Sequence, residues 1–172
     1  MPRVVRLASA PIRGDCLKNP FRFLLHVPVP WVFVLTYLVG YAAERYHPFA
    51  ISPELARGFW VTGIVLFAVG LAIAGWGQIL FRKARTTTVP GKVSAKLVTS
   101  GPYRFTRNPM YVGLTLVYLG EAGLLKQIWP VLFLPLMIVY LNWTVIPLEE
   151  GKLTEAFPNE YPEYQSRVRR WM

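Results

Sequence analysis

The sequence has few of the residues that build metal sites and disulfide frameworks. Its 172 residues include a single cysteine, Cys16, and two histidines, His26 and His47, which lie far apart along the chain. A single cysteine excludes an intrachain disulfide and any cysteine-rich metal site, and two distant histidines do not make a zinc site. We therefore predict no metal centre.

Charged residues are also scarce, at 16% of the chain against 53% hydrophobic residues. Acidic side chains are the scarcer kind, with 9 Asp and Glu beside 19 Lys and Arg, which gives a net charge of +10. A nucleic-acid-binding domain would combine such cations with exposed aromatic residues on a polar fold. Here the charges lie between long uncharged stretches, which indicates a membrane protein and no nucleic-acid partner.

Three stretches carry no charged residue and can each supply the roughly 20 apolar residues that cross a bilayer as a helix, namely 23–43, 58–81 and 127–148. A fourth run, 110–120, is shorter, and we expect it to extend to Leu125 as a short or tilted helix. Backbone groups in hydrocarbon must bond to one another, so these segments are helices if they span. The predicted fold class is an all-α integral membrane protein, a small transmembrane helical bundle of about four spans.

Positive charges indicate the orientation of this bundle. Lys and Arg gather before the run 23–43 and between the runs 58–81 and 110–120, whereas the other loops are nearly balanced. The positive-inside rule then places both termini in the cytoplasm, and the short chain favours a bacterial inner membrane. Leu153, Phe157, Tyr161 and Tyr164 recur at helical intervals and predict a cytoplasmic C-terminal helical tail in two short pieces. Its Arg167, Arg169 and Arg170 are expected to contact anionic lipid.

The stretch GPYRFTRNPMYVG, residues 101–113, places a polar, conformationally restricted bend directly against an apolar run. Pro109 suits the first turn of a helix, Gly113 allows a close approach to the backbone, and free amides at a helix start favour an anion. Tyr103 and Tyr111 offer flat faces to an aromatic ligand.

Glu149 and Glu150, which directly follow the run 127–148, can receive a cation or ribose hydroxyls. Arg104 and Arg107 would offset the cost of these two carboxylates at the membrane boundary if the two chain segments meet. An anion site, an aromatic platform and a cation site together match a zwitterionic nucleoside such as S-adenosylmethionine. NADPH matches the first two features, but its phosphates fit paired carboxylates poorly.

The segments LVTSGPYRFTRNPMYVG and EEGKLTEAFPNEYPEYQSRVRRW resemble two motifs of the membrane methyltransferases related to isoprenylcysteine carboxyl methyltransferase and to phospholipid methyltransferases. The resemblance covers Leu97 to Trp171. It implies a helical bundle that binds S-adenosylmethionine from the cytoplasmic side and takes a lipophilic acceptor from the bilayer. Glu149 and Arg107 are the predicted catalytic residues. The predicted cofactor contacts are Gly101, Pro102, Tyr103, Arg107, Asn108, Pro109, Tyr111, Gly113, Glu149, Glu150, Tyr161 and Tyr164.

Two positions depart from the family pattern. Many relatives have histidine where this chain has Asn108, and asparagine cannot act as a base near neutral pH. The eukaryotic prenylcysteine enzymes have an arginine four residues before the position of Glu149, where this chain has Val145. Without that cation, an amine, a thiol or another lipid acceptor gains over a carboxylate, although Arg104 or Arg107 could take its place.

The favoured function is therefore a methyltransferase of the isoprenylcysteine carboxyl methyltransferase type. The alternatives are a phospholipid amine or thiol methyltransferase, an NADPH-dependent membrane reductase of the sterol type, and a non-enzymatic membrane bundle. The predicted organisation has a basic N-terminal segment (1–22), two membrane helices with a cytoplasmic loop (23–96), and a methyltransferase-like core with its tail (97–172).

Overall fold

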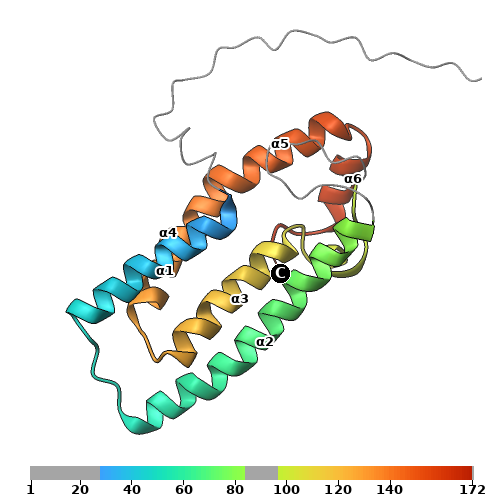
Figure 1. Ribbon diagram of the computed structural model, residues 1–172. Coiled ribbons are helices and arrows are strands. Elements are labelled where there is room, and N and C mark those ends of the chain that lie inside the picture. Colours follow the sequence, from blue (N-terminus) through green and yellow to red (C-terminus); the bar gives the residue numbers. More distant parts are fainter. Residues whose placement is uncertain (1–27, 84–96, 172) are drawn as a thin grey trace, which may run out of the picture.

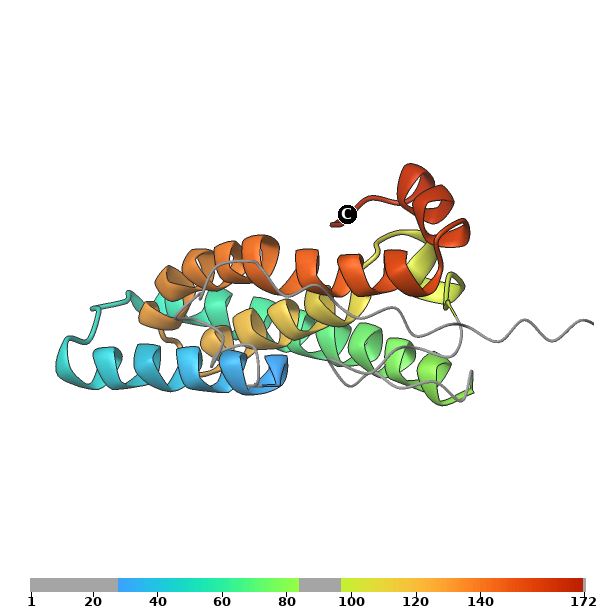
Figure 2. The ribbon, with the colours of Figure 1, turned by 90° about the horizontal axis from the view of Figure 1, so that it is seen from above.

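The computed structural model describes residues 28–83 and 97–171, and all regular secondary structure in these ranges is helical. Helices α1, α2, α3 and the rod formed by α4 and α5 lie alongside one another, and the short α6 lies near the end of α5 (Figures 1 and 2). In chain order the elements are α1 (Val29–Tyr46), α2 (Pro53–Lys83), the 3-10 turn η2 (Gly101–Arg104), α3 (Pro109–Leu124), α4 (Trp129–Tyr140), the π-helical turn η3 (Leu141–Val145), α5 (Ile146–Ala156) and α6 (Glu160–Arg167).

Two helical stretches in the described ranges are long and apolar enough to cross a membrane: Pro53–Leu80 of α2, and Trp129–Ala156, which runs through α4, η3 and α5. Only 11% and 22% of their most apolar windows are buried inside the protein. Such large outward-facing apolar surfaces are expected of a helical membrane protein. Helices α1 and α3 have 18 and 16 residues in the described ranges, and the arrangement of four spans with a cytoplasmic tail stays a prediction.

Several predicted boundaries differ from the observed helices. Helix α2 exceeds the charge-free run 58–81 at both ends, and α1 reaches Tyr46, while residues 1–27 of the predicted N-terminal segment and first span lie outside the described residues. The exit of the fourth span at Glu149 and Glu150 stays a prediction, but the helix does not end there. The helical rod continues through both residues to Ala156, because the π turn η3 lets the chain pass Pro147 without breaking.

Helices α2 and α3 pack with their backbones in direct contact. A Cβ atom added at Gly70 would lie 2.6 Å from the backbone nitrogen of Val117 and 2.7 Å from the carbonyl oxygen of Gly113. One added at Gly120 would lie 2.4 Å from the backbone nitrogen of Phe67. Since small residues let membrane helices approach closely, these glycines set the separation and the register of the two helices. The same close approach recurs at Gly63 and Gly123.

At the end of the bundle away from α6, the carboxylate of Glu44, in the last turn of α1, joins α1 to the start of α4 through hydrogen bonds. It accepts backbone N–H bonds from Phe49 at 3.0 Å, Ile128 at 2.9 Å and Trp129 at 3.1 Å. The last two bonds cap the start of α4, where a negative charge is favourable. Burial opposes ionisation of Glu44, but the three N–H donors outweigh it and hold the pKa of this carboxyl below its usual value.

Replacing Gly70 with Ala should lower the free energy of unfolding by about 1–3 kcal/mol, because the new Cβ meets backbone atoms of α3 that cannot turn aside. Gly75→Ala is the matched control in the same helix, since a Cβ there meets nothing within 4 Å. The control should keep or raise stability, by up to about 1 kcal/mol from helix propensity. Thermal unfolding of both variants in one detergent measures the difference, and equal stabilities would contradict the close packing of α2 on α3.

Candidate active site

The start of α3 and the first turn of α5 meet through one hydrogen bond. The hydroxyl of Tyr111 donates to Oε1 of Glu149 at 2.6 Å, between two partly buried side chains that lie 38 residues apart in sequence. A bond of this length to a carboxylate is charge-assisted and stronger than one between neutral groups. The two sequence motifs therefore come together at one place in the fold.

The bend before α3 is shaped by Gly101, which has a φ of +62° in η2. This left-handed conformation favours glycine, and a Cβ there would also lie 2.6 Å from Cδ1 of Leu80. The bend therefore packs tightly on the last turns of α2, with Pro102 and Tyr103 buried beneath it. Pro109 occupies the first turn of α3, as predicted from its fixed φ.

Glu150 forms the centre of an ion network. Nη2 of Arg107 lies 3.3 Å from its Oε1, and Nη2 of Arg170 lies 2.6 Å from its Oε2. Both Glu150 and Arg107 are largely shielded, with side-chain exposures of 13% and 14%. The hydrogen bond to Glu150 raises the pKa of Arg170 above its ordinary value, so this pair stays ionised. The prediction that Arg170 contacts anionic lipid is therefore wrong, because its guanidinium turns inward to a carboxylate.

Residues 168–171, which we name the C-terminal strap, lie over the bend before α3. The backbone N–H of Arg107 donates to the carbonyl of Arg169 at 2.9 Å. The carbonyl of Arg170 accepts from Oγ1 of Thr106 at 2.9 Å and from Nδ2 of Asn108 at 3.0 Å. The side chain of Asn108 thus holds the strap, and it makes no cap hydrogen bond to α3.

The π turn η3 anchors the other edge of the strap. Its Asn142 accepts from Nη1 of Arg170, at 3.3 Å through the backbone carbonyl and 3.1 Å through Oδ1, and Nε1 of Trp171 donates to Oδ1 at 3.2 Å. In this turn the N–H of Ile146 bonds to a carbonyl five residues back, and Pro147 has no N–H to offer the next one. That next carbonyl belongs to Asn142, and it accepts a hydrogen bond from the guanidinium of Arg170 instead.

Helix α6 covers the bend with two aromatic rings. Tyr161 is 2% exposed, and its ring centroid lies 6.1 Å from that of Tyr164. The hydroxyl of Tyr164 donates to the carbonyl of Tyr103 at 2.7 Å. Burial, with a smaller contribution from Glu150, raises the pKa of Tyr161 to about 12, so this phenol stays neutral at physiological pH.

Most of the predicted site residues are thus gathered at one end of the bundle, although their roles in cofactor binding and catalysis stay predictions. Gly113 is an exception, because α2 occupies the space beside it: a Cβ there would lie 2.8 Å from the backbone nitrogen of Ala74. Arg104 is exposed and makes no ion pair within the described residues.

Sequence analysis missed five residues that the structure brings to this region. They are Gln78, Thr106, Asn142, Arg170 and Trp171. For Gln78 and Asn142 the sequence signal is weak: each is an amide inside a charge-free run, and Pro147 follows Asn142 by five residues. The other three lie within the two quoted motifs, which do not show their hydrogen bonds.

Two buried side-chain atoms in the described part of the chain have no hydrogen-bond partner, Nε of Arg107 and Oε1 of Gln78. Gln78 follows Gly77, where an added Cβ would lie 3.2 Å from Cγ of Met110 and 3.7 Å from the hydroxyl oxygen of Tyr103. Buried polar atoms are nearly always paired, so each of these two atoms is an exception for which the described residues supply no partner. Within the described ranges, no cluster of His, Cys, Asp and Glu could hold a metal ion.

A family model for phospholipid methyltransferases matches residues 59–160, which contain the Tyr111–Glu149 pair. The chain belongs to the phospholipid methyltransferase family. It is therefore a member of a family of membrane methyltransferases, as the resemblance over Leu97 to Trp171 predicts.

One curated relative is the cobalt-zinc-cadmium resistance protein CzcN of Cupriavidus metallidurans, which is 31% identical over 113 residues. That match covers 64% of this chain and 50% of the relative, so the chain spans about half the length of the relative it matches. No solved structure gives a significant match to this chain.

Replacing Glu150 with Gln should lower the free energy of unfolding by about 2 kcal/mol, because Arg107 and Arg170 lose the carboxylate that they share. The strap should also become a faster target for trypsin at Arg169. Glu163→Gln is the matched control, since it removes an ion pair with Arg167 whose side chains are both 67% exposed. That change should stay within about 0.5 kcal/mol. Equal losses in thermal unfolding would show that the buried network adds nothing.

Proposed function

We propose that this protein transfers a methyl group from S-adenosylmethionine to a lipophilic acceptor drawn from the bilayer. The observation that carries the proposal is the Tyr111–Glu149 hydrogen bond beside Arg107, which gathers a phenol, a carboxylate and a guanidinium at one end of a membrane bundle. Membership of the phospholipid methyltransferase family supports it, and so do the apolar surfaces of the two candidate spans.

The residues present fit this cofactor. S-adenosylmethionine, when bound, supplies an electrophilic methyl group, and it carries a carboxylate, an ammonium group and an adenine amine that need partners. The open Nε donor of Arg107 suits the carboxylate, and the open Oε1 acceptor of Gln78 suits an N–H group. Glu149 offers a partly buried negative charge to the cationic part, and the partly buried ring of Tyr111 offers a face to the adenine.

Glu149 is prepared for its role by Tyr111. The phenol fixes Oε1, while Oε2 makes no hydrogen bond within the described residues and is open to a ligand. A methyl transfer with a neutral leaving group needs no acid, so alignment of the two reactants is the main contribution of the protein. Tyr111 serves this alignment by holding the carboxylate in one orientation.

We further propose that the acceptor atom is an amine or a thiol. Val145 is 8% exposed and stands where a carboxyl-methylating relative would have an arginine, and both inward-facing arginines are held by Glu150. A carboxylate acceptor therefore has no cation of its own at position 145. An amine or thiol releases a proton when it is methylated, and Glu149 is the carboxylate positioned to take it.

Replacing Glu149 with Gln should lower methyl transfer by about 100-fold or more, because the amide keeps a hydrogen bond to Tyr111 but loses the charge and the base. Incubation with labelled S-adenosylmethionine and a total lipid extract measures the rate, and mass spectrometry of the labelled product identifies the acceptor. Glu155→Gln, on an exposed position of α5, is the matched control and should keep the native rate. A native rate with native affinity for S-adenosylhomocysteine in Glu149→Gln would refute the assignment.

Replacing Gln78 with Leu separates a ligand contact from a structural role. The variant should keep or gain thermal stability, because a buried acceptor without a partner is removed. Its affinity for S-adenosylhomocysteine by calorimetry should fall about 10-fold, as expected for the loss of one hydrogen bond to a ligand. Thr62→Val, an exposed polar position in the same helix, should change neither quantity. Unchanged affinity in Gln78→Leu would exclude Gln78 from the site.

A further inference from the structure

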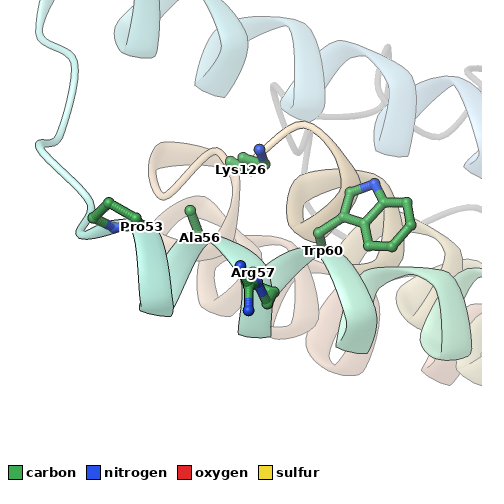
Figure 3. A pocket seen from close by; sticks show the side chains of 5 residues that line it. All are labelled: Pro53, Ala56, Arg57, Trp60 and Lys126. Carbon is green, nitrogen blue, oxygen red and sulfur yellow. The ribbon is translucent and has the colours of Figure 1, made fainter.

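A hollow of about 350 Å³ lies beside the start of α2, and Figure 3 shows the side chains that line it. Four of its lining residues, from the first two turns of α2, are spaced as one helical face, and the fifth comes from the turn between α3 and α4. They are Pro53, Ala56, Arg57, Trp60 and Lys126.

This hollow is remote from the candidate active site. Arg57 lies 20 residues before Gly77, which contacts the bend at that site, and 20 helical residues span about 30 Å. That length is close to the thickness of the hydrocarbon core of a bilayer. In the predicted arrangement of four spans, the hollow lies at the membrane surface opposite to the Tyr111–Glu149 pair.

The hollow carries positive charge that the described residues do not neutralise. Arg57 and Lys126 are both exposed, and neither forms an ion pair with a described carboxylate. The carboxylate of Glu44 accepts hydrogen bonds from three backbone N–H groups and forms an ion pair with neither cation. Glu54 and Glu121 are the other acids close in sequence, and they pair with neither cation. Two cations at a membrane surface attract anionic head groups.

Trp60 adds the aromatic side chain typical of a membrane interface. It is 47% exposed on the same face of α2 as Arg57, and Figure 3 shows its indole ring at the hollow with Lys126. Tryptophan is enriched at the depth of lipid head groups, where its ring meets the glycerol and upper acyl chain. The hollow therefore combines a charged part for a head group with an apolar edge.

The backbone of Lys126 is an independent indication that its side chain has a use. Its φ is 56°, and among the described residues no other non-glycine residue has a positive φ. Its N–H bonds to the carbonyl of Gly123 at 3.1 Å, and that of Gln127 bonds to Ala122 at 2.8 Å, which is the helix-ending Schellman pattern that normally has glycine at this position. Lysine here costs free energy that glycine would not, and such strain is retained where the side chain is needed.

We propose that the hollow binds the phosphate of an anionic phospholipid from the leaflet opposite to the active site. The phosphate would lie between Arg57 and Lys126, with Trp60 beside the glycerol. This inference is independent of methyl transfer, because none of its residues belongs to the candidate active site.

The test uses the full-length protein in detergent, titrated with phosphatidylglycerol or phosphatidylcholine and measured by native mass spectrometry. Lys126→Gly and Arg57→Gln should each weaken phosphatidylglycerol binding about 5-fold, the effect expected of one surface cation, and the double variant about 25-fold. Phosphatidylcholine, with the same phosphate but no net charge, should bind the native protein more weakly. Arg45→Gln is the matched control, because it removes an exposed cation from the same end of the bundle outside the hollow.

Lys126→Gly also guards against loss of folding, because glycine should keep or raise the thermal stability of the lipid-free protein. A separate titration uses inorganic phosphate. If millimolar phosphate does not compete with phosphatidylglycerol, the result supports a lipid head group. If phosphate saturates the hollow and phosphatidylglycerol does not bind, the lipid proposal is overturned. The proposal also fails if the double variant binds phosphatidylglycerol as the native protein does, or if Arg45→Gln loses as much affinity.

Discussion

Backbone contact between α2 and α3 is the constraint on which the position of the candidate site depends. Within a bilayer, lipid tails are as apolar as the helix surfaces, so close packing must hold membrane helices together. At Gly70 and Gly120 the approach leaves no room for a side chain. With the two helices fixed in register, the bend before α3 is placed on the last turns of α2, where Gly101 meets Leu80 and Gly77 meets Met110.

Neighbouring carboxylates in α5 serve two different purposes. Successive helical residues point about 100° apart, so Glu149 and Glu150 reach different partners. Glu149 accepts a hydrogen bond from the phenol of Tyr111 and is the residue for which we propose a role in methyl transfer. Glu150 is shared by two guanidinium groups and holds the C-terminal strap, which is a structural task. The strap in turn covers the bend that carries Arg107.

The π turn connects these tasks to the rest of the rod. Pro147 has no N–H to donate to the carbonyl of Asn142, and the guanidinium of Arg170, in the strap, donates to that carbonyl instead. A helix that could have broken at a proline thus continues and carries Glu149 to Tyr111. At the far end, Glu44 caps α4 and positions the turn that holds Lys126. The bundle therefore has ionic and aromatic side chains gathered at one end and a cationic hollow at the other.

The sequence by itself determined the helical elements, the apolar surfaces of the two candidate spans and the family. These follow from local properties: charge-free runs of sufficient length, a proline at a helix start, and two motifs read in order. It also indicated that the Tyr111 region and Glu149 should meet, since two carboxylates at a membrane boundary need partners.

Only the tertiary structure decided which partner each polar group takes. Arg170 was expected at the lipid surface and pairs with Glu150, the Glu149–Glu150 pair lies within a rod rather than at its end, and Gly113 serves the packing of α2. These outcomes depend on residues tens of positions apart competing for the same few buried polar atoms. No local pattern records that competition, because a buried charge is stabilised by whichever partner the packed backbones bring within reach.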